Sequence, residues 1–268
     1  MFYWKNTGDL KYLAIEEFNS VGVKAFFTSR LGGISTGSYG QLNLGLHTGD
    51  QREAVLTNRR LIAEALGYDY RDLVAGEQIH SNRIAQVNRE DRGRGALSHQ
   101  DSIPGVDGLI TCQKNLPLFS FYADCVPVLL ADPLKGVVGL VHAGWKGTLQ
   151  RIVEKALRQM EEIYHCSPRD VIAAIGPAIS GDHYQVDQRV ITQFRSSFQN
   201  WREFSSGDGK ENYRLNLPRA NQLQLLAMGI PLSQIIMSDL CTYRDNHSFF
   251  SYRRDGGITG RMASIISI

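Results

Sequence analysis

The sequence lacks the features of an exported or membrane-spanning chain. It has only four cysteines in 268 residues, and a chain of this length needs no disulfide bonds to fold. No apolar run approaches the roughly 20 residues that cross a bilayer, and the polar amino terminus, MFYWKNTGDLKY, does not resemble a signal peptide. We therefore expect reduced thiols, no contact with membranes and a cytoplasmic location.

The sequence also lacks an excess of charge, low-complexity segments and repeats. It has 29 basic and 27 acidic residues, for a net charge of +2, so no strong field would attract nucleic acid. Glycines and prolines are scattered rather than gathered in a linker, and the apolar content of 43% is enough for a sizeable core. We therefore expect a single domain over residues 1–268, and a monomer whose partners are small molecules.

Several motifs of known cofactor sites are absent as well. The chain contains neither the GxxxxGK[ST] of a P-loop nor the GxGxxG of a dinucleotide-binding fold. Its seven histidines form no HxH pair, whereas a four-copper oxidase needs about ten histidine ligands, many of them in such pairs. HxE and PCxxC, which mark the usual zinc nucleobase deaminases, are missing too. These absences argue against multicopper chemistry and against a deaminase site of the usual kind.

The residues that are present predict short strands mixed with long helices. Periodic apolar residues predict helices over residues 51–66, 149–163 and 218–228, the last with Pro218 in its first turn. Runs of branched apolar residues predict strands over residues 23–28, 84–87, 108–111, 119–122, 171–175, 235–237 and 249–252. Helices mixed with hairpins favour an α+β fold with a mixed sheet over a strictly alternating parallel one.

One stretch, YADCVPVLLADPLKGVVGLVHAGWKG, has the pattern of a β-hairpin with a cysteine and a histidine at its open end. Two apolar segments flank a break at Asp132. Pairing Asp132 with Lys135 across the turn would place Cys125 opposite His142, with Cβ atoms about 4.5–5.5 Å apart. A thiolate and an imidazole that close could share one metal ion.

His80 is the best candidate for a third metal ligand. It lies in AGEQIHSNRIAQV, directly before a predicted strand, where its ring can point into a cleft. One thiolate and two imidazoles suit zinc, with Cu(I) as the alternative, and leave a fourth position for water or substrate. The competing explanation is a structural histidine at a strand end. We expect solvated or capping roles for the other histidines, at positions 47, 99, 165, 183 and 247.

Two residues beside the ligands have both functional and structural explanations. Asp124 directly precedes Cys125, so it is either a proton carrier or outer partner of the metal site, or a residue that caps the strand. Lys146 lies where a helix should begin, a position at which backbone N–H groups attract anions. Its alternative is an ordinary helix start.

Two further segments are suited to a ligand. FTSRLGGISTGSYGQLNLG carries Arg30 and five glycines, whose backbone N–H groups could meet a phosphate. FFSYRRDGGITGR brings Arg253, Arg254 and Arg261 together with aromatic rings, a mixture suited to an aromatic, anion-bearing ligand. A solvated basic edge strand would have the same composition.

Together these motifs resemble the YfiH family, whose members are labelled laccase-domain or polyphenol oxidase proteins. The resemblance covers nearly the whole chain and keeps the order of the motifs. It rests on TSRLGG around Arg30, Asn43-Leu44-Gly45, Gln78-x-His80, Asp107-Gly108, Ala123-Asp124-Cys125, His142-Ala143-Gly144-Trp145-Lys146-Gly147, Ile175-Gly176-Pro177-x-Ile179, Tyr184-x-Val186 and Ser251-Tyr252-Arg253-Arg254.

The resemblance implies a single-domain, four-layer α/β/β/α fold with two mixed β-sheets, and a zinc ion held by His80, Cys125 and His142. It also implies phosphorolysis of adenosine, inosine, guanosine and S-methyl-5′-thioadenosine, together with deamination of adenosine. Purine nucleosides and phosphate would then be the partners. On this basis we expect catalytic roles for Asp124 and Cys125, and substrate or phosphate contacts from Arg30, Asn43, Gln78, Lys146 and Arg253.

Other functions stay open at this point. Cys125 and His142 would also suit a cysteine hydrolase, in which a thiolate nucleophile lies beside its base, and the family has been associated with editing of peptidoglycan precursors. A single bound copper would allow laccase-like oxidation of polyphenols. A nucleotide-binding module with structural zinc is disfavoured, because structural sites fill their fourth position with a protein ligand.

Overall fold

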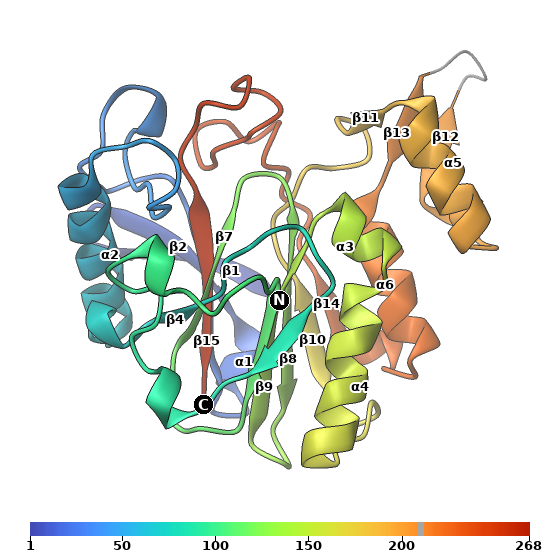
Figure 1. Ribbon diagram of the computed structural model, residues 1–268, viewed down its shortest axis with the longest axis horizontal. Helices are drawn as coiled ribbons and strands as arrows, with labels where there is room; N and C mark the ends of the chain where they lie inside the picture. Colours follow the sequence, from blue (N-terminus) through green and yellow to red (C-terminus); the bar gives the residue numbers. More distant parts are fainter. Residues whose placement is uncertain (208–211) are drawn as a thin grey trace.

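Two six-stranded sheets form the centre of the protein (Figure 1). The computed structural model describes residues 1–207 and 212–268. The first sheet contains, in spatial order, β1 (Phe2–Thr7), β2 (Leu10–Ile15), β3 (Lys24–Thr28), β15 (Met262–Ser267), β7 (Leu118–Tyr122) and β4 (Val74–Ala75). The second contains β14 (Ile235–Met237), β10 (Ile172–Ile175), β8 (Val126–Asp132), β9 (Val137–Ala143), β6 (Gly108–Thr111) and β5 (Ile84–Gln86). Both sheets are mixed, because β4 runs parallel to β7, β14 to β10 and β5 to β6, whereas the other neighbours are antiparallel.

Helices cover the outer face of each sheet, which makes four layers. α2 (Arg52–Leu66) packs on the first sheet, and α4 (Ile152–Tyr164) and α6 (Leu217–Ala227) pack on the second. A further apolar layer lies between the sheets, where Ile266 of β15 and Leu129 of β8 belong to one buried cluster. The predicted α+β class and the α/β/β/α layering with two mixed sheets are confirmed.

The remaining elements are short. Three strands form a small sheet beside α5 (Gln188–Ser197), at the upper right of Figure 1: β11 (Gln185–Val186), β13 (Tyr213–Leu215) and β12 (Ser205–Gly207). The other short helices are α1 (Glu16–Asn19) and α3 (Trp145–Leu149). Single 3-10 turns occur at Gly37–Tyr39, Tyr70–Asp72, Arg89–Asp91, His99–Asp101, Trp201–Glu203 and Leu232–Gln234.

The helix predicted over residues 149–163 is α4, which begins at Ile152, three residues later than predicted. Arg151 separates it from the short helix α3 with a left-handed φ of 59°, a conformation that costs free energy for a residue with a side chain. Its guanidinium donates to Glu154 at 2.6 Å and to the backbone oxygen of Ser197 at 2.9 Å. These contacts tie the break to the residues around α5, which lie far away in the sequence.

The hairpin forms, but its register differs from the prediction by two residues. Pro127 lies opposite His142, and Asp132 lies opposite Val137. The turn is therefore longer than expected, because the Asp132 carboxylate accepts hydrogen bonds from the N–H groups of Leu134 and Lys135, both at 3.0 Å. Cys125 consequently does not face His142 across the ladder. A shift of two residues keeps both on the same face of the sheet, so the two side chains become diagonal neighbours.

The strand predicted over residues 249–252 is wrong. Phe249 and Phe250 are completely buried, as a strand would require, but the Phe249 carbonyl accepts a hydrogen bond from the Arg254 side chain at 2.9 Å. The closing strand is instead β15, which pairs with β3 and β7. Those partners are remote in the sequence, so no local pattern indicates the pairing.

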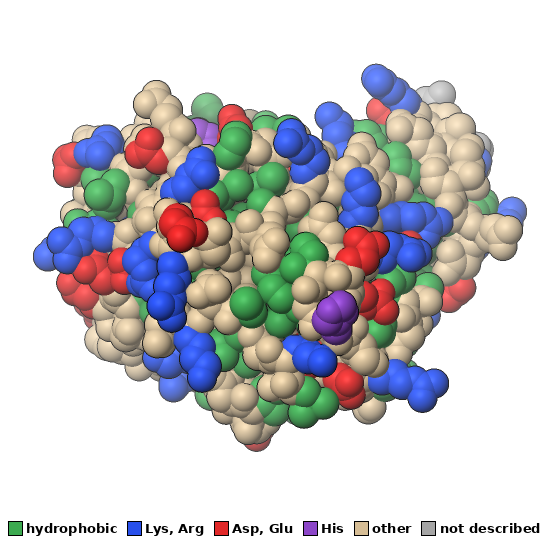
Figure 2. All heavy atoms as spheres, turned by 60° about the horizontal axis from the view of Figure 1, so that its bottom comes forward, with side chains coloured by type: hydrophobic (Ala, Val, Ile, Leu, Met, Phe, Trp, Pro, Cys, Tyr) green, Lys and Arg blue, Asp and Glu red, His purple; other side chains and the backbone are tan. Residues whose placement is uncertain are grey.

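The surface agrees with the balanced composition. On the face shown in Figure 2, acidic and basic side chains are interspersed rather than segregated. Among the described residues, no helix combines the length and the apolar character that crossing a bilayer requires. The single-domain, monomeric and cytoplasmic interpretations stay predictions.

Candidate metal centre and active-site cavity

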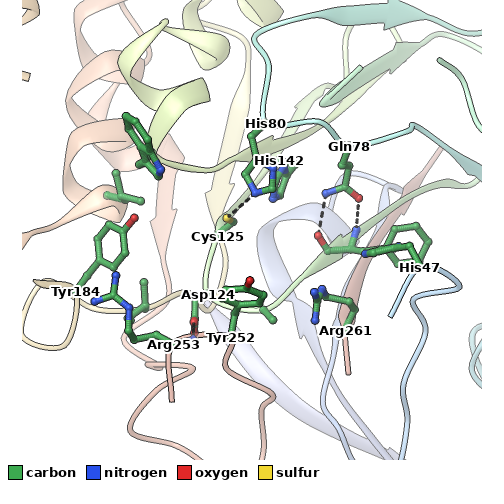
Figure 3. A pocket seen from close by; sticks show the side chains of 15 residues that line it. His47, Gln78, His80, Asp124, Cys125, His142, Tyr184, Tyr252, Arg253 and Arg261 are labelled. Carbon is green, nitrogen blue, oxygen red and sulfur yellow. Dashed lines mark hydrogen bonds between the residues drawn. The ribbon is translucent and has the colours of Figure 1, made fainter. Parts of the chain in front are cut away.

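The topology of the second sheet brings three polar side chains together at one end of its inner strands. β9 is antiparallel to both β8 and β6, so its carboxyl end lies beside the starts of these two neighbours. His142 lies near the end of β9, Cys125 directly precedes β8, and Asp107 directly precedes β6. His80 reaches the same place from the loop between β4 and β5 (Figure 3).

The structure brings the three predicted ligands together. One ligand atom from each of His80, Cys125 and His142 lies within 4.8 Å of the other two. His80 Nε2 is 3.9 Å from the Cys125 sulfur, and the two imidazole centroids are 5.0 Å apart. His142 is buried and Cys125 is half-buried, whereas His80 is open to solvent. In residues 1–207 and 212–268, no other set of three or more His, Cys, Asp or Glu side chains has this arrangement.

Asp107 organises this cluster, a role that the sequence reasoning missed. Its carboxylate accepts hydrogen bonds from His142 Nδ1 at 2.9 Å and from the backbone N–H groups of His80 and Ser81 at 3.0 and 2.6 Å. The bonds to the backbone hold His80 in its left-handed conformation, with a φ of 60°. The bond to Nδ1 keeps a proton on that nitrogen, so Nε2 is the nitrogen of His142 that would lose its proton and coordinate a metal. The signal in the sequence was an aspartate, Asp107, directly before the predicted strand over residues 108–111.

The electrostatics of the cluster favour a thiolate. Burial raises the pKa of Cys125, but the imidazoles of His142 and His80 outweigh this effect and bring it to about 6. Burial lowers the pKa of His142, and the Cys125 thiolate and the Asp107 carboxylate more than reverse this, raising it to about 9. Thiolate is the form of cysteine that binds metals. A thiolate with two imidazoles is a donor set that fits zinc or Cu(I).

Gly144 provides the space in which two of the ligands meet. A Cβ atom at this position would lie 2.9 Å from His80 Cδ2 and 3.1 Å from the Cys125 sulfur. Any side chain would therefore push the imidazole and the thiol away from their positions. The glycine of the His142-Ala143-Gly144 motif is thus required by the close approach of these two groups.

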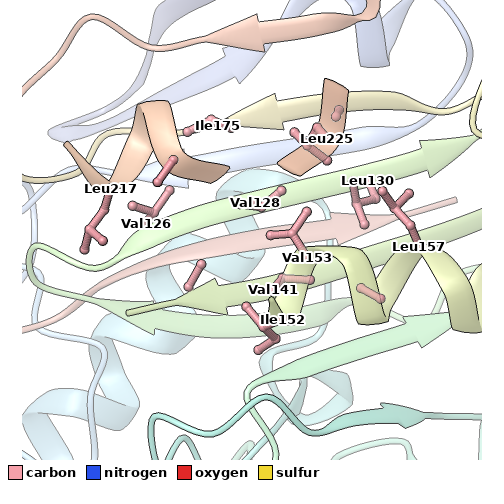
Figure 4. Close-up of a cluster of buried hydrophobic side chains, with 14 of the residues drawn as sticks. Val126, Val128, Leu130, Val141, Ile152, Val153, Leu157, Ile175, Leu217 and Leu225 are labelled. Carbon is pink, nitrogen blue, oxygen red and sulfur yellow. The ribbon is translucent and has the colours of Figure 1, made fainter. Parts of the chain in front are cut away.

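The cluster opens into a cavity of about 460 Å³, a size suited to a small-molecule ligand. Tyr184 and Arg253 lie on one side of the cluster, and Arg261 and His47 lie on the other (Figure 3). Leu217 also lines the cavity and belongs to the buried cluster of Figure 4, beneath α4 and α6. One part of the cavity wall is therefore a continuation of the rigid core.

Asp124 lines the cavity, but its carboxylate is already engaged. Its two oxygens accept hydrogen bonds from the Thr242 hydroxyl and from the backbone N–H of Arg253, both at 2.7 Å. In Figure 3 the side chain points away from the Cys125 sulfur. Asp124 thereby fixes the loops that form this part of the wall, and its catalytic role stays a prediction.

Gln78 and Arg253 also line the cavity. The Gln78 amide is bonded at both ends to the backbone of Phe121, at 2.9 and 2.8 Å, so it joins the loop of His80 to the end of β7. The Arg253 guanidinium lies over the Tyr184 ring at 5.0 Å and donates to the backbone oxygen of Gln185 at 2.7 Å. Both polar groups of the Gln78 side chain are therefore occupied by the backbone, whereas the Arg253 side chain is exposed and can contact a ligand.

Three predicted contact residues lie outside the cavity lining. The Arg30 side chain donates twice to the backbone oxygen of Gly40, at 3.0 and 2.6 Å, and lies over the ring of Phe250. Asn43 is completely buried, and Lys146 is exposed on the short helix α3. Arg30 and Asn43 hold loops in place, and for all three residues a role in binding phosphate stays a prediction.

Comparison with known proteins places the chain in a family. The model of the family described as multi-copper polyphenol oxidoreductase laccase matches residues 24–268. A protein from Geobacillus stearothermophilus named purine nucleoside phosphorylase YlmD is 43% identical over 250 residues, which cover 91% of this chain and 90% of that protein. A Bacteroides thetaiotaomicron protein named purine nucleoside phosphorylase is 34% identical over 264 residues, 98% of each chain.

Solved structures agree with this relationship. The crystal structure of YlmD from Geobacillus stearothermophilus superposes with a TM-score of 0.94 at 38% identity and covers 100% of this chain and 99% of that one. The crystal structure of the hypothetical protein YfiH from Bacillus licheniformis also has a TM-score of 0.94 at 38% identity, with coverage of 99% and 98%. Sequence similarity and fold thus agree, and the chain belongs to the laccase-like YfiH family, whose model is the multi-copper polyphenol oxidoreductase laccase.

Proposed function

We propose that this protein is a zinc-dependent purine nucleoside phosphorylase. The observation that carries the proposal is the convergence of His80, Cys125 and His142 within 4.8 Å of one another in the wall of a cavity. The names of the relatives support the same activity. The four-copper chemistry suggested by the family description is not supported, because the described residues provide one such cluster and the sequence has only seven histidines.

In the proposed reaction a phosphate oxygen forms a bond to C1′ of the ribose, and the bond from C1′ to the purine nitrogen breaks. The electron pair of that bond goes to the purine, which is then protonated, and ribose 1-phosphate is the other product. Negative charge therefore develops on the leaving base. Phosphate is itself an anion and brings further negative charge into the site. A site for this reaction needs a surface for the base, cations for the anions, and exact mutual placement of the two substrates.

Residues of this chain can meet each requirement. Tyr184 and Tyr252 offer aromatic surface to a purine, and Leu217 offers apolar surface. Arg253 and Arg261 supply positive charge. Asp124, the carboxylate of the described cavity lining, is held at both oxygens by the Thr242 hydroxyl and the Arg253 backbone N–H.

The donor set fits a metal ion on chemical grounds. Cys125 is a thiolate at neutral pH because its pKa lies near 6, and Asp107 fixes the His142 tautomer that presents Nε2. When bound, zinc would supply Lewis acidity, either to stabilise charge on the leaving purine or to lower the pKa of a water molecule. The protein's part is to hold the three ligands and to leave the cavity side of the cluster open.

We extend the proposal to adenosine, inosine, guanosine and S-methyl-5′-thioadenosine as substrates, with deamination of adenosine as a second activity. The family resemblance supports this range. Deamination needs a group that moves protons, and the chain has no HxE motif to supply a glutamate. Asp124 is the carboxylate of the described cavity lining and is our candidate for that role.

The test compares the four nucleosides with and without phosphate, and monitors the free base, ammonia and the sugar phosphate, which is ribose 1-phosphate or, from S-methyl-5′-thioadenosine, 5-methylthioribose 1-phosphate. We expect base release to require phosphate and ammonia to come from adenosine alone. Release of base without phosphate would indicate a hydrolase and contradict the proposal. Asp124→Asn should reduce ammonia release more than phosphorolysis if Asp124 carries the proton.

A cysteine hydrolase is the second candidate, because the low pKa of Cys125 also suits a nucleophile beside the base His142. The two candidates differ in metal content. Purified protein that contains no metal, and whose Cys125 forms a covalent acyl adduct with substrate, would favour the hydrolase. One copper per chain with oxidation of phenols would favour a laccase-like enzyme.

A further inference from the structure

Among the described residues no carboxylate forms an ion pair with Arg261, a cation in the cavity wall, although the negative charges of Cys125 and Asp124 act on it from a distance. It is half-buried, and burial lowers the pKa of its guanidinium. One terminal nitrogen, Nη1, donates to the backbone oxygens of Thr259 and Gly260 at 2.8 and 3.0 Å. Within the part of the chain that the structure describes, its Nε and Nη2 have no hydrogen-bond acceptor. A partly desolvated guanidinium with free donors is suited to an anion that enters from solution.

Asn43 holds Arg261 in this position. The Asn43 side-chain oxygen accepts hydrogen bonds from the backbone N–H groups of Arg261 and Gly45, at 2.9 and 3.1 Å. Its amide nitrogen donates to Thr48 and Asp50, at 2.9 and 3.0 Å. One buried amide therefore connects the segment of Arg261 to residues 45–50, which carry His47.

Gly45 allows the two segments to pack closely. A Cβ atom on Gly45 would lie 2.9 Å from Cγ of Arg261, so the Arg261 stem rests directly on the backbone of this loop. Close packing restricts the rotamers of a long side chain. The guanidinium is thereby placed before any ligand arrives, which lowers the entropic cost of binding.

His47 adds a neutral donor beside Arg261. Its ring lines the cavity and contacts Phe121 edge-on, with centroids 5.7 Å apart. Desolvation and the charge of Arg261 lower the pKa of His47, so the ring is uncharged at pH 7 and offers one N–H. Phe121 is itself fixed by both ends of the Gln78 amide.

Both guanidinium groups of the cavity lie over a tyrosine ring, Arg253 over Tyr184 at 5.0 Å and Arg261 over Tyr252 at 5.7 Å, but their other neighbours differ. The Arg253 side chain also donates to the Gln185 backbone, so it belongs to the side of the cavity formed by Tyr184. Arg261 and His47 lie on the other side of the metal cluster (Figure 3). Only the side with Arg261 combines a guanidinium with the neutral ring of His47 and a backbone held by Asn43, which suits it to a small oxyanion.

We propose that Arg261 and His47 form the subsite for the inorganic phosphate co-substrate, and that Asn43 is the positioning residue that holds this subsite together. The identification of the anion as phosphate rests on the proposed phosphorolysis. The presence of an anion site depends only on the geometry of Arg261, His47 and Asn43.

The experiment titrates inorganic phosphate alone into metal-loaded protein and monitors binding by calorimetry. We expect the wild type to bind phosphate, Arg261→Met to bind at least about 30-fold more weakly, and Arg261→Lys about 10-fold more weakly, because lysine keeps the charge but loses the fork of donors. His47→Phe should weaken binding by about 3- to 10-fold, since it removes one neutral donor. The matched control is Arg60→Met, which makes the same substitution at an exposed position of α2 and should bind as the wild type does.

Steady-state rates provide a second readout. Arg261→Lys should raise the KM for phosphate at least about tenfold and leave the KM for inosine nearly unchanged. The proposal is overturned if folded Arg261→Met, verified by circular dichroism, binds phosphate as tightly as Arg60→Met. It is also overturned if the wild type binds no phosphate, or if adenosine 5′-monophosphate binds through Arg261 and free phosphate does not.

These outcomes are separate from a failure of the proposed function. If the protein cleaves no purine nucleoside, the titration of phosphate alone still tests the subsite. Binding that is lost in Arg261→Met would then support an oxyanion site in an enzyme of another specificity. Phosphorolysis with an unchanged phosphate KM in Arg261→Lys would keep the proposed function and reject the subsite.

Discussion

The Asp107 carboxylate accepts a hydrogen bond from Nδ1 of His142 at 2.9 Å, and both side chains are buried. Asp107 and His142 lie side by side at the adjacent ends of β6 and β9, where the backbone N–H of His142 also donates to the Asp107 backbone oxygen at 2.7 Å. The same carboxylate holds the loop of His80. One acidic residue therefore orients two of the three candidate metal ligands.

Replacing Asp107 should weaken metal binding without removing a ligand. We expect Asp107→Asn to lose roughly 10- to 100-fold in zinc affinity, because an amide can donate to Nδ1 and favour the wrong tautomer of His142. Competition with a chromogenic chelator measures this affinity. The control, Asp101→Asn, makes the same change at an exposed position and should retain full affinity. Equal affinities for the two variants would contradict the role of Asp107.

A methyl group at position 144 should disturb the same centre by a different route. Gly144→Ala places a Cβ atom 2.9 Å from the His80 ring and 3.1 Å from the Cys125 sulfur. One of these ligands must move, so we expect weaker zinc binding and an altered visible absorption spectrum after substitution with cobalt. An unchanged cobalt spectrum would show that the two ligands do not approach each other in this way.

The thiol of Cys125 should be reactive in metal-free protein at unusually low pH. Its alkylation rate should rise with a midpoint near pH 6, the pKa of the thiol, because only the thiolate reacts. Below that pH the thiol gains a proton and the rate falls. Peptide mass spectrometry separates this modification from that of the exposed Cys112. His142→Gln should move the midpoint upward, towards about 8.5, and bound zinc should suppress the reaction.

Arg59 should contribute strongly to stability, unlike its neighbour Arg60. The buried Arg59 guanidinium donates to the backbone oxygens of Leu44, Gly95 and Ala96, at distances of 2.8, 2.7 and 2.6 Å. Arg59→Met leaves these acceptors without donors, so we expect a loss of at least about 2 kcal/mol in the free energy of unfolding. Urea denaturation measures it. The exposed Arg60→Met should change stability by less than about 0.5 kcal/mol, and similar losses for both would refute the assignment.

The convergence of the candidate metal ligands could be predicted from the sequence because local patterns defined their surroundings. The apolar segments on either side of Asp132 indicated a hairpin, and a hairpin places its two open ends together. The turn was predicted too short, since the pattern did not show that Asp132 bonds to Leu134 and Lys135. The resulting shift of two residues left Cys125 and His142 on one face, so the error did not separate them.

The other cavity residues depend on contacts between distant segments. Arg261 reaches the site because β15 pairs with β3 and β7, and no local pattern specifies that pairing. Asn43 was predicted to bind phosphate, whereas the structure shows it bonded to the backbone of Arg261. His47 was expected in a solvated loop and instead lines the cavity. Composition and motifs indicated arginines and aromatic rings that suit an aromatic, anionic ligand. The tertiary fold determined which of these side chains reach the cavity.

Elemental analysis of the purified protein, combined with a phosphate-dependent inosine assay on the same samples, tests the central claim most directly. We predict about one zinc per chain in the wild type, and joint loss of zinc and phosphorolysis in Cys125→Ala, with normal folding by circular dichroism. Full phosphorolysis by metal-free protein, or by Cys125→Ala, would contradict the account.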